Sequence, residues 1–170
     1  MIVLDVDGVL TDAGLIIGTG GLEIMKFNVQ DGAGIALARR AGYRVGIISG
    51  RLSDLILRRA ELLGIEEVYH GRFHKLPAYE EILKKYHYKD SEICYMGDDI
   101  LDLPIIRRAG FSVAVANAVR EVKVEADYIT KLPGGNGAVR EVLDLILDVS
   151  GKKRQVIEAL LKEEERELIP

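Results

Sequence analysis

Short apolar runs alternate with longer segments of helical periodicity along this chain, and that alternation restricts the fold more than any other feature. Runs of three to six residues match the length of buried strands. The predicted strands are residues 2–6, 43–48, 67–70, 92–96, 111–115 and 127–129. Because strands that alternate with helices favour parallel pairing, we expect an α/β fold, a three-layer Rossmann-like parallel sheet flanked by helices.

Two segments outside the predicted strands carry clear helical stripes. Their apolar residues are Leu52, Leu55, Ile56, Leu62 and Leu63 in the first, and Val139, Val142, Leu143, Ile146 and Leu147 in the second. A further helix is predicted to begin at Asp31 as its N-cap, to run to Ala41 and to stop at Gly42. Residues 13–28 break the alternation, because two apolar stretches flank the string GTGG at 18–21, which is typical of a β-hairpin.

Length and composition are consistent with one domain and a tail. A chain of 170 residues with 48% hydrophobic content can bury a sizeable core, and residues 1–150 are predicted to form it. Residues 151–170 are highly charged but place Val156, Ile157, Leu160 and Leu161 at helical spacing. We expect this stretch to be a charged C-terminal helix or a frayed tail.

Charge and cysteine content exclude several classes of partner. A net charge of −4 gives no reason to expect nucleic acid or an anionic membrane as a partner. The single cysteine, Cys94, lies in an apolar run, so a buried inert thiol is expected and no intramolecular disulfide can form. No stretch approaches the ~18 apolar residues of a membrane helix. The opening MIVLDVDG is too short an apolar run for a signal peptide, because its first acidic residue already stands at position 5. These features favour a cytoplasmic location.

Polar residues follow three of the apolar runs directly. The first run ends in Asp5 and Asp7, inside DVDGVLTD, where Gly8 permits a sharp turn. Ligands of open α/β sheets collect beyond the carboxyl ends of strands, where two carboxylates can hold a cation, attack an electrophile or move a proton. The alternative interpretation of a lone Asp-x-Asp is that it caps a turn.

The later motifs argue against that alternative. Ser49 ends the run in ISGR, Lys75 follows in HGRFHKLPA, and GDDILD carries Asp98, Asp99 and Asp102. In order and spacing these resemble the four signature motifs of the haloacid dehalogenase superfamily of phosphotransferases. The resemblance implies that family's fold, with the 13–28 hairpin as a small flap. Only 42 positions separate Asp7 from Ser49 and 26 separate Ser49 from Lys75, so neither gap holds a cap domain. The likeness is to the capless subclass, whose site a neighbouring subunit or a large substrate closes.

The residue types are suited to hydrolysis of a phosphate monoester. Asp5 is the predicted nucleophile, and it forms an aspartyl-phosphate. Mg²⁺ is the predicted cofactor, with Asp5, the main-chain carbonyl of Asp7 and Asp98 as ligands. Asp7 is the predicted general acid and later base, and it must be protonated when the substrate binds. Ser49 and Lys75 are predicted to bind the phosphoryl oxygens, with Lys75 also facing Asp5.

The remaining acidic residues are predicted to support this site. Asp99 and Asp102 would orient the groups around the metal, and Asp102 is expected to hold Lys75 or a metal-bound water. The alternative is that both simply favour the positive end of a helix that begins near Ile100. For Lys75 the alternative is an ordinary solvated lysine at the start of a helix.

A closer resemblance is to the 3-deoxy-D-manno-octulosonate 8-phosphate phosphatase family. It rests on DVDGVLTD, FNVQDGAGI, ISGR, HGRFHKL, GDDILDLP, VAVANA, DYIT and PGGNGAVREVLDLIL, and extends from Ile2 to about Val149. The resemblance implies hydrolysis of a small phosphorylated sugar acid, use of Mg²⁺, and a homotetramer whose neighbouring hairpins close the site. It implies a substrate pocket formed by Asn28, Val29, Gln30, Asp31, Gly32, Arg51, Arg59 and Lys75.

Three departures from that family keep other substrates open. Gln30, Ala36 and Asn136 stand where relatives commonly carry arginine or another residue, and each lost guanidinium removes a bidentate partner for an anion. The alternatives are a related nine-carbon sugar-acid phosphatase, against which Arg51 argues, and a broad-specificity sugar phosphatase. A phospho-accepting regulatory or binding module is the non-enzyme alternative, although Asp7 favours turnover. A phosphomutase would need a cap to exclude water.

Overall fold

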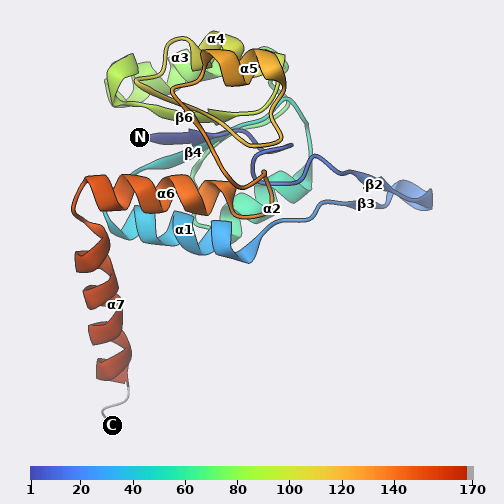
Figure 1. Cartoon of the computed structure of the whole chain (residues 1–170). Helices are drawn as coiled ribbons and strands as arrows, with labels where there is room; N and C mark the ends of the chain where they lie inside the picture. The colour runs from blue at the N-terminus through green and yellow to red at the C-terminus, as the bar shows by residue number, and fades with distance from the viewer. Residues whose placement is uncertain (168–170) are drawn as a thin grey trace.

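The computed structural model describes residues 1–167 and places a six-stranded parallel sheet between two layers of helices (Figure 1). The sheet order is β5-β4-β1-β6-β7-β8. The strands are β1 Ile2–Leu4, β4 Val45–Ile48, β5 Glu67–Tyr69, β6 Cys94–Gly97, β7 Phe111–Ala114 and β8 Tyr128–Ile129. The predicted three-layer α/β fold is confirmed, and each predicted strand is present within two residues at either end.

Helices cover both faces of the sheet (Figure 1). One layer contains α1 Val29–Arg40, α2 Asp54–Leu62 and α6 Ala138–Val149, and the other contains α3 Lys75–Tyr86, α4 Leu103–Ile106 and α5 Arg120–Glu125. Short 3₁₀ turns are η1 Thr19–Gly21, η2 Asp90–Glu92 and η3 Ile100–Asp102. Within residues 1–167 there is no helix with both the length and the apolar character that crossing a membrane requires.

Strand β1 lies at the centre of the sheet and positions the site. Its residues pair in parallel with β4 on one side and with β6 on the other, and its apolar side chains are fully buried. After β1 the chain therefore first forms β4 and β5 on one side of β1, and then forms β6, β7 and β8 on the other side. At such a switch point the carboxyl ends of neighbouring strands border a crevice. Asp5, Ser49 and Asp98 directly follow these three strands.

The hairpin and the last helix both project from the body (Figure 1). The predicted hairpin is confirmed as the antiparallel pair β2 Ile16–Ile17 and β3 Glu23–Ile24. Its four strand residues include three isoleucines that are between 45% and 72% exposed, so this flap is an apolar surface. Helix α7 spans Lys153–Glu167 and extends from the other end of the molecule. Residues 168–170 of the predicted tail lie outside the described residues, and the boundary at residue 150 stays a prediction.

The predicted N-cap at Asp31 is wrong. Asn28 caps α1, because its Oδ1 accepts hydrogen bonds from Gln30 N at 2.7 Å and Asp31 N at 3.3 Å. Asp31 lies in the first turn and is buried, and its carboxylate accepts from Gly137 N at 3.2 Å and Arg140 N at 2.8 Å. A carboxylate at the start of α6 complements the positive end of that helix. Asp31 therefore joins α1 to α6, two helices that are far apart in sequence.

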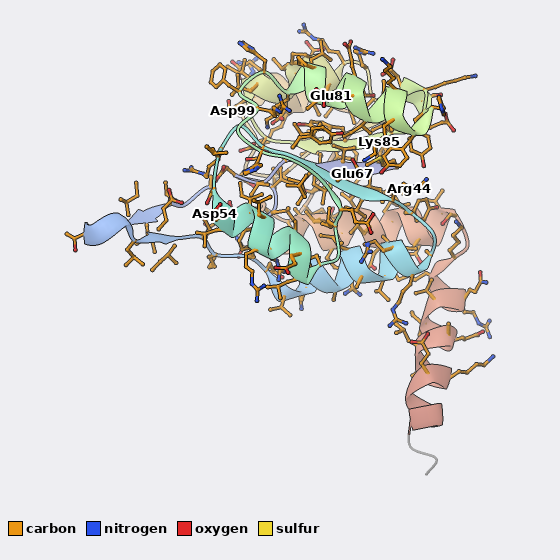
Figure 2. The ribbon with its side chains drawn as sticks, turned by 180° about the vertical axis from the view of Figure 1, so that it is seen from behind. Arg44, Asp54, Glu67, Glu81, Lys85 and Asp99 are labelled. Atoms are coloured by element: carbon orange, nitrogen blue, oxygen red, sulfur yellow. The ribbon has the colours of Figure 1, made fainter. Side chains whose placement is uncertain are left out.

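Two buried groups far from the sheet's carboxyl edge have structural roles. Glu67, at the start of β5, accepts hydrogen bonds from Lys85 Nζ and the Tyr86 hydroxyl, which fastens the end of α3 to the sheet. Figure 2 shows Glu67 and Lys85 together, with Asp99 toward the hairpin end of the molecule. Cys94 is buried as predicted, and burial raises the pKa of its thiol to about 12, so the thiol stays protonated.

Candidate active site

The loop after β1 is held in place by hydrogen bonds to one carbonyl and one hydroxyl. The carbonyl of Val6 accepts hydrogen bonds from the backbone amides of Val9, Leu10 and Thr11, and the Thr11 hydroxyl accepts one from Gly8 N at 3.3 Å. Gly8 has φ of +88°, and a Cβ there would lie 1.9 Å from Asp98 Oδ2. Only glycine fits, because a side chain would be strained and would displace Asp98.

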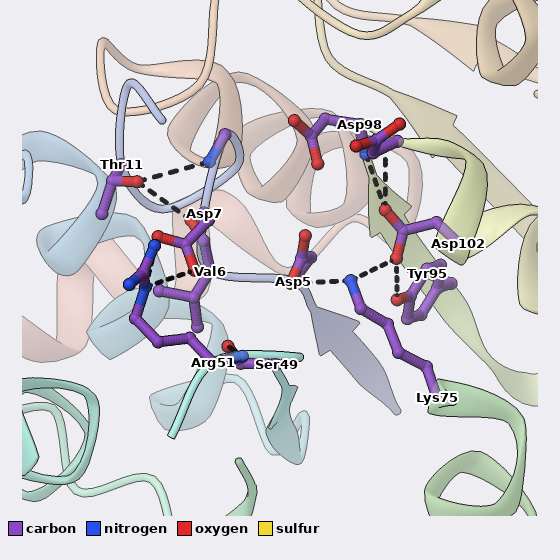
Figure 3. Close-up of polar contacts among 12 residues, drawn as sticks. Asp5, Val6, Asp7, Thr11, Ser49, Arg51, Lys75, Tyr95, Asp98 and Asp102 are labelled. Atoms are coloured by element: carbon purple, nitrogen blue, oxygen red, sulfur yellow. Dashed lines mark hydrogen bonds and ion pairs between the residues drawn. The ribbon is translucent and has the colours of Figure 1, made fainter. Parts of the chain in front are cut away.

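Lys75 lies between two carboxylates at the centre of the site (Figure 3). Its Nζ is 2.8 Å from Asp5 Oδ1 and 2.6 Å from Asp102 Oδ1. The side chains of Lys75, Asp5 and Asp102 are 4%, 6% and 0% exposed, so Lys75 is not the solvated residue of the alternative interpretation. A lysine at the first position of α3 thus brings a buried positive charge to the end of β1.

Asp102 is saturated with hydrogen-bond donors. Its Oδ2 accepts from Asp98 N at 3.0 Å and Asp99 N at 3.1 Å, while its Oδ1 accepts from Lys75 Nζ and from the Tyr95 hydroxyl at 2.5 Å. Four donors occupy the lone-pair directions of the carboxylate, so we assign Asp102 to holding its neighbours and not to a metal. Asp99 is exposed, and its Oδ1 caps Ile100 N at 2.7 Å.

The site has more negative than positive charge. Burial raises the pKa of Asp5 well above its ordinary range, although Lys75 opposes the shift. Burial and the neighbouring Asp102 raise the pKa of Asp98 to about 6. Burial alone would lower the pKa of Lys75, but the carboxylates of Asp5 and Asp102 outweigh it and raise that pKa. One ammonium therefore faces three crowded carboxylates.

The donor set suits a hard divalent cation. Carboxylate oxygens of Asp5, Asp98 and Asp102 lie within 4.8 Å of one another. With Asp102 saturated, Asp5 and Asp98 are the carboxylates available for a metal, and within residues 1–167 the Asp98 carboxylate accepts no hydrogen bond from a backbone amide. Oxygen ligands of this kind are the ones that Mg²⁺ prefers.

Stability of the metal-free protein should fall as the pH rises from about 4 to about 6. In that range the folded protein keeps a proton on Asp98 that the unfolded chain has already released, so deprotonation costs folding free energy, on the order of 3 kcal/mol. A divalent cation bound to Asp98 would replace that proton. Adding MgCl₂ should therefore raise the melting temperature more at about pH 7.5 than at about pH 5, as measured by scanning calorimetry against EDTA.

The matched control for this prediction is Asp98→Asn, in which the magnesium-dependent gain should disappear. Equal gains at both pH values, or a gain that survives in Asp98→Asn, would contradict a metal held by Asp98.

Asp7, Arg51 and Ser49 form a second cluster beside Asp5 (Figure 3). Arg51 Nε lies 3.2 Å and 3.1 Å from the two carboxylate oxygens of Asp7, and both side chains are about 30% exposed. Ser49 is fully buried, and its hydroxyl oxygen accepts from Arg51 N at 3.1 Å, so its proton is left to donate elsewhere. Arg51, which the family resemblance places in the substrate pocket, is therefore paired with Asp7 inside the site.

The predicted substrate segment lies at the amino end of α1, beside α2. Arg59 Nη2 donates to the carbonyl of Asn28 at 3.1 Å, and the Arg59 guanidinium carbon lies 5.5 Å from the ring centre of Phe27. A Cβ on Gly32 would lie 2.6 Å from Arg59 Nη2, so glycine allows this close packing. Val29 and Gln30 are exposed, whereas Asp31 faces α6. Arg59 therefore stabilises the backbone of this segment through the Asn28 carbonyl and packs against Phe27.

Sequence reasoning missed three residues that shape the site. Thr11 organises the loop, and Asn117 joins it to the turn before α6, because its side chain donates to Gly8 O at 3.0 Å and accepts from Gly134 N at 2.6 Å. Both occur in strings that the family resemblance uses, DVDGVLTD and VAVANA. Tyr95 carries no such signal, because a tyrosine within an apolar strand is indistinguishable from a core residue.

Comparisons with known proteins show what this chain is similar to. The haloacid dehalogenase-like hydrolase family matches residues 47–143. The 3-deoxy-D-manno-octulosonate 8-phosphate phosphatase KdsC of Escherichia coli K12 is 43% identical over 152 residues, 89% of this chain and 81% of the relative. The solved structure of the 3-deoxy-D-manno-octulosonate 8-phosphate phosphatase from Moraxella catarrhalis, in complex with magnesium ion, phosphate ion and KDO, has a TM-score of 0.91 and 40% identity, covering 94% of this chain and 91% of that one. The phosphatase from Yersinia pestis has a TM-score of 0.89 and 42% identity, covering 90% and 83%.

Proposed function

The chain belongs to the 3-deoxy-D-manno-octulosonate 8-phosphate phosphatase family of haloacid dehalogenase-like hydrolases, and we propose that it hydrolyses 3-deoxy-D-manno-octulosonate 8-phosphate through an aspartyl-phosphate on Asp5. As a member it is a phosphoric monoester hydrolase. The observation that carries the proposed mechanism is the buried contact of Lys75 with Asp5 at the end of β1. Relatives that act on or bind this sugar acid support the proposed substrate.

In the first step a carboxylate oxygen of Asp5 attacks phosphorus, and the bond between phosphorus and the sugar oxygen breaks. Asp7 gives its proton to that leaving oxygen. Lys75 holds Asp5 in place for the attack, and the Ser49 hydroxyl donates to a phosphoryl oxygen. These contacts stabilise the charge that spreads over the phosphoryl oxygens in the transition state.

In the second step a water molecule attacks the phosphorus of the aspartyl-phosphate, and Asp7 takes the proton of that water. The bond between phosphorus and the Asp5 oxygen breaks, so inorganic phosphate leaves and the Asp5 carboxylate is restored. Asp7 must release Arg51, at least in part, to act as the acid. An anionic group of the substrate near Arg51 would favour that release, because it offers the guanidinium another partner.

We propose Asp5, Asp98 and the main-chain carbonyl of Asp7 as the protein ligands of Mg²⁺. When bound, the ion neutralises phosphoryl charge and lets a carboxylate approach an anionic ester. The excess of carboxylates over cations among Asp5, Asp98, Asp102 and Lys75 supports this assignment.

Phosphate release from a panel of sugar phosphates tests the proposed function. With Mg²⁺, the kcat/KM for octulosonate 8-phosphate should exceed that for neutral hexose phosphates by at least about 10²-fold, as one or two ion pairs to the sugar-acid carboxylate would give. It should also exceed that for nine-carbon sugar-acid phosphates, which carry the same carboxylate but differ in chain length. EDTA should abolish release. A flat profile would contradict this substrate and favour a broad sugar phosphatase, and stable phosphorylation without turnover would favour the phospho-accepting module.

The predicted homotetramer also belongs to this proposal. The exposed isoleucines of the β2–β3 hairpin support it, because an apolar flap of this kind is suited to contact with a neighbouring subunit. Light scattering on the eluting protein measures the mass, and a fully active monomer would contradict the assembly. The cytoplasmic location stays a prediction.

A further inference from the structure

Tyr95 lies in β6 behind the reacting groups and has no part in the chemistry described above. Its side chain is fully buried, and its hydroxyl is 2.5 Å from Asp102 Oδ1 (Figure 3). The same oxygen accepts from Lys75 Nζ at 2.6 Å, and Lys75 Nζ is 2.8 Å from Asp5. A single oxygen of Asp102 therefore links the tyrosine to the lysine that faces the nucleophile.

The direction of the hydrogen bond is fixed by the chemistry of the pair. Burial and the neighbouring carboxylates raise the pKa of Tyr95 well above its ordinary range, so the phenol keeps its proton. Both oxygens of Asp102 act as acceptors, which leaves Tyr95 as the donor. Hydrogen bonds from a hydroxyl to a carboxylate are short and strong, and burial strengthens them further.

We propose that Tyr95 is a positioning residue that keeps the Lys75 ammonium shared between Asp102 and Asp5. Its hydroxyl takes up part of the charge on Asp102 Oδ1, so this oxygen attracts Lys75 less strongly than it would with Lys75 as its one donor. Without the hydroxyl, Lys75 would move onto Asp102 and away from Asp5. This inference rests on the proposed function, in which Asp5 is the nucleophile.

Tyr95→Phe removes the hydroxyl and keeps the ring. We expect kcat to fall about tenfold, the effect of one charge-assisted hydrogen bond on the reacting group, while KM stays within about twofold. The loss should be the same for octulosonate 8-phosphate and for p-nitrophenyl phosphate, because the change acts on Asp5 and not on the sugar. Tyr79→Phe is the matched control, since Tyr79 is also fully buried and its hydroxyl bonds a carboxylate, Asp90 Oδ1, at 2.8 Å.

A measurement on Lys75 itself separates positioning from a structural role. The ¹⁵N resonance of the Lys75 ammonium, assigned by its loss in Lys75→Met, should move in Tyr95→Phe and stay unchanged in Tyr79→Phe. In the wild-type protein the Tyr95 hydroxyl proton should exchange slowly and show a nuclear Overhauser effect to the Lys75 ammonium, a test that does not depend on the folding of Tyr95→Phe. Because these spectra need no substrate, they decide the role of Tyr95 even where no phosphate is released.

An unchanged kcat together with an unmoved Lys75 resonance in Tyr95→Phe would overturn the proposal. Equal losses of kcat in Tyr95→Phe and Tyr79→Phe would also overturn it, because they would mark a general effect of removing a buried hydroxyl. So would the absence of the hydroxyl contact to Lys75 in the wild-type spectra.

Discussion

Asp5→Asn should abolish phosphate release, with a fall in kcat of at least about 10⁴-fold, because the amide cannot attack phosphorus. The substitution keeps the size of the side chain and removes one of three crowded carboxylates. Since burial already raises the pKa of Asp5 well above its ordinary range, the charge is costly to the fold, and the free energy of unfolding should not decrease. Phosphate release and urea unfolding measure the two effects.

The matched control is Asp54→Asn, at the exposed first position of α2, which should leave kcat within about twofold of the wild type. Asp5→Asn with more than about 1% of the wild-type kcat would contradict the role of Asp5 as nucleophile, on the scale that loss of a nucleophile sets.

Lys75→Met should damage both activity and stability. The ammonium is the buried cation that faces Asp5 and Asp102, so its removal leaves two carboxylates uncompensated at a cost of about 3–5 kcal/mol. Loss of its charge near the phosphoryl group should lower kcat by at least about 10²-fold. Urea unfolding and phosphate release report the two losses, and Lys84→Met, on the exposed side of the same helix, should cause neither.

A double variant separates the two roles of Lys75. Lys75→Met combined with Asp102→Asn removes both members of the buried pair, and it should regain part of the lost free energy of unfolding without regaining kcat. If kcat returned together with stability, the loss in Lys75→Met would come from misfolding and not from a role at the phosphoryl group.

The sequence predicted the fold because its signals are local. Apolar strands such as Ile2–Leu4 and Val45–Ile48 are short and continuous, and the polar residues after them identify the carboxyl edge of a parallel sheet. Chain order and spacing then placed Asp5, Ser49 and Asp98 at that edge. These signals do not depend on which side chains meet across the structure.

Contacts between distant segments could not be predicted in the same way. Asp31 has the local features of an N-cap, but its carboxylate is buried against the start of α6, more than 100 residues away. The partner of Arg51 is likewise set by how the loops after β1 and β4 face each other. Tyr95 has the pattern of a core residue, and only its neighbour Asp102 gives it a polar role.

The stereochemistry at phosphorus tests the central claim, attack by Asp5, most directly. A phosphate ester made chiral with oxygen isotopes is hydrolysed in isotopically labelled water with Mg²⁺, and the configuration of the released phosphate is determined. Two successive in-line displacements, first by Asp5 and then by water, predict retention of configuration. Inversion would mean that water attacks the ester directly, and the aspartyl-phosphate on Asp5 would then be wrong.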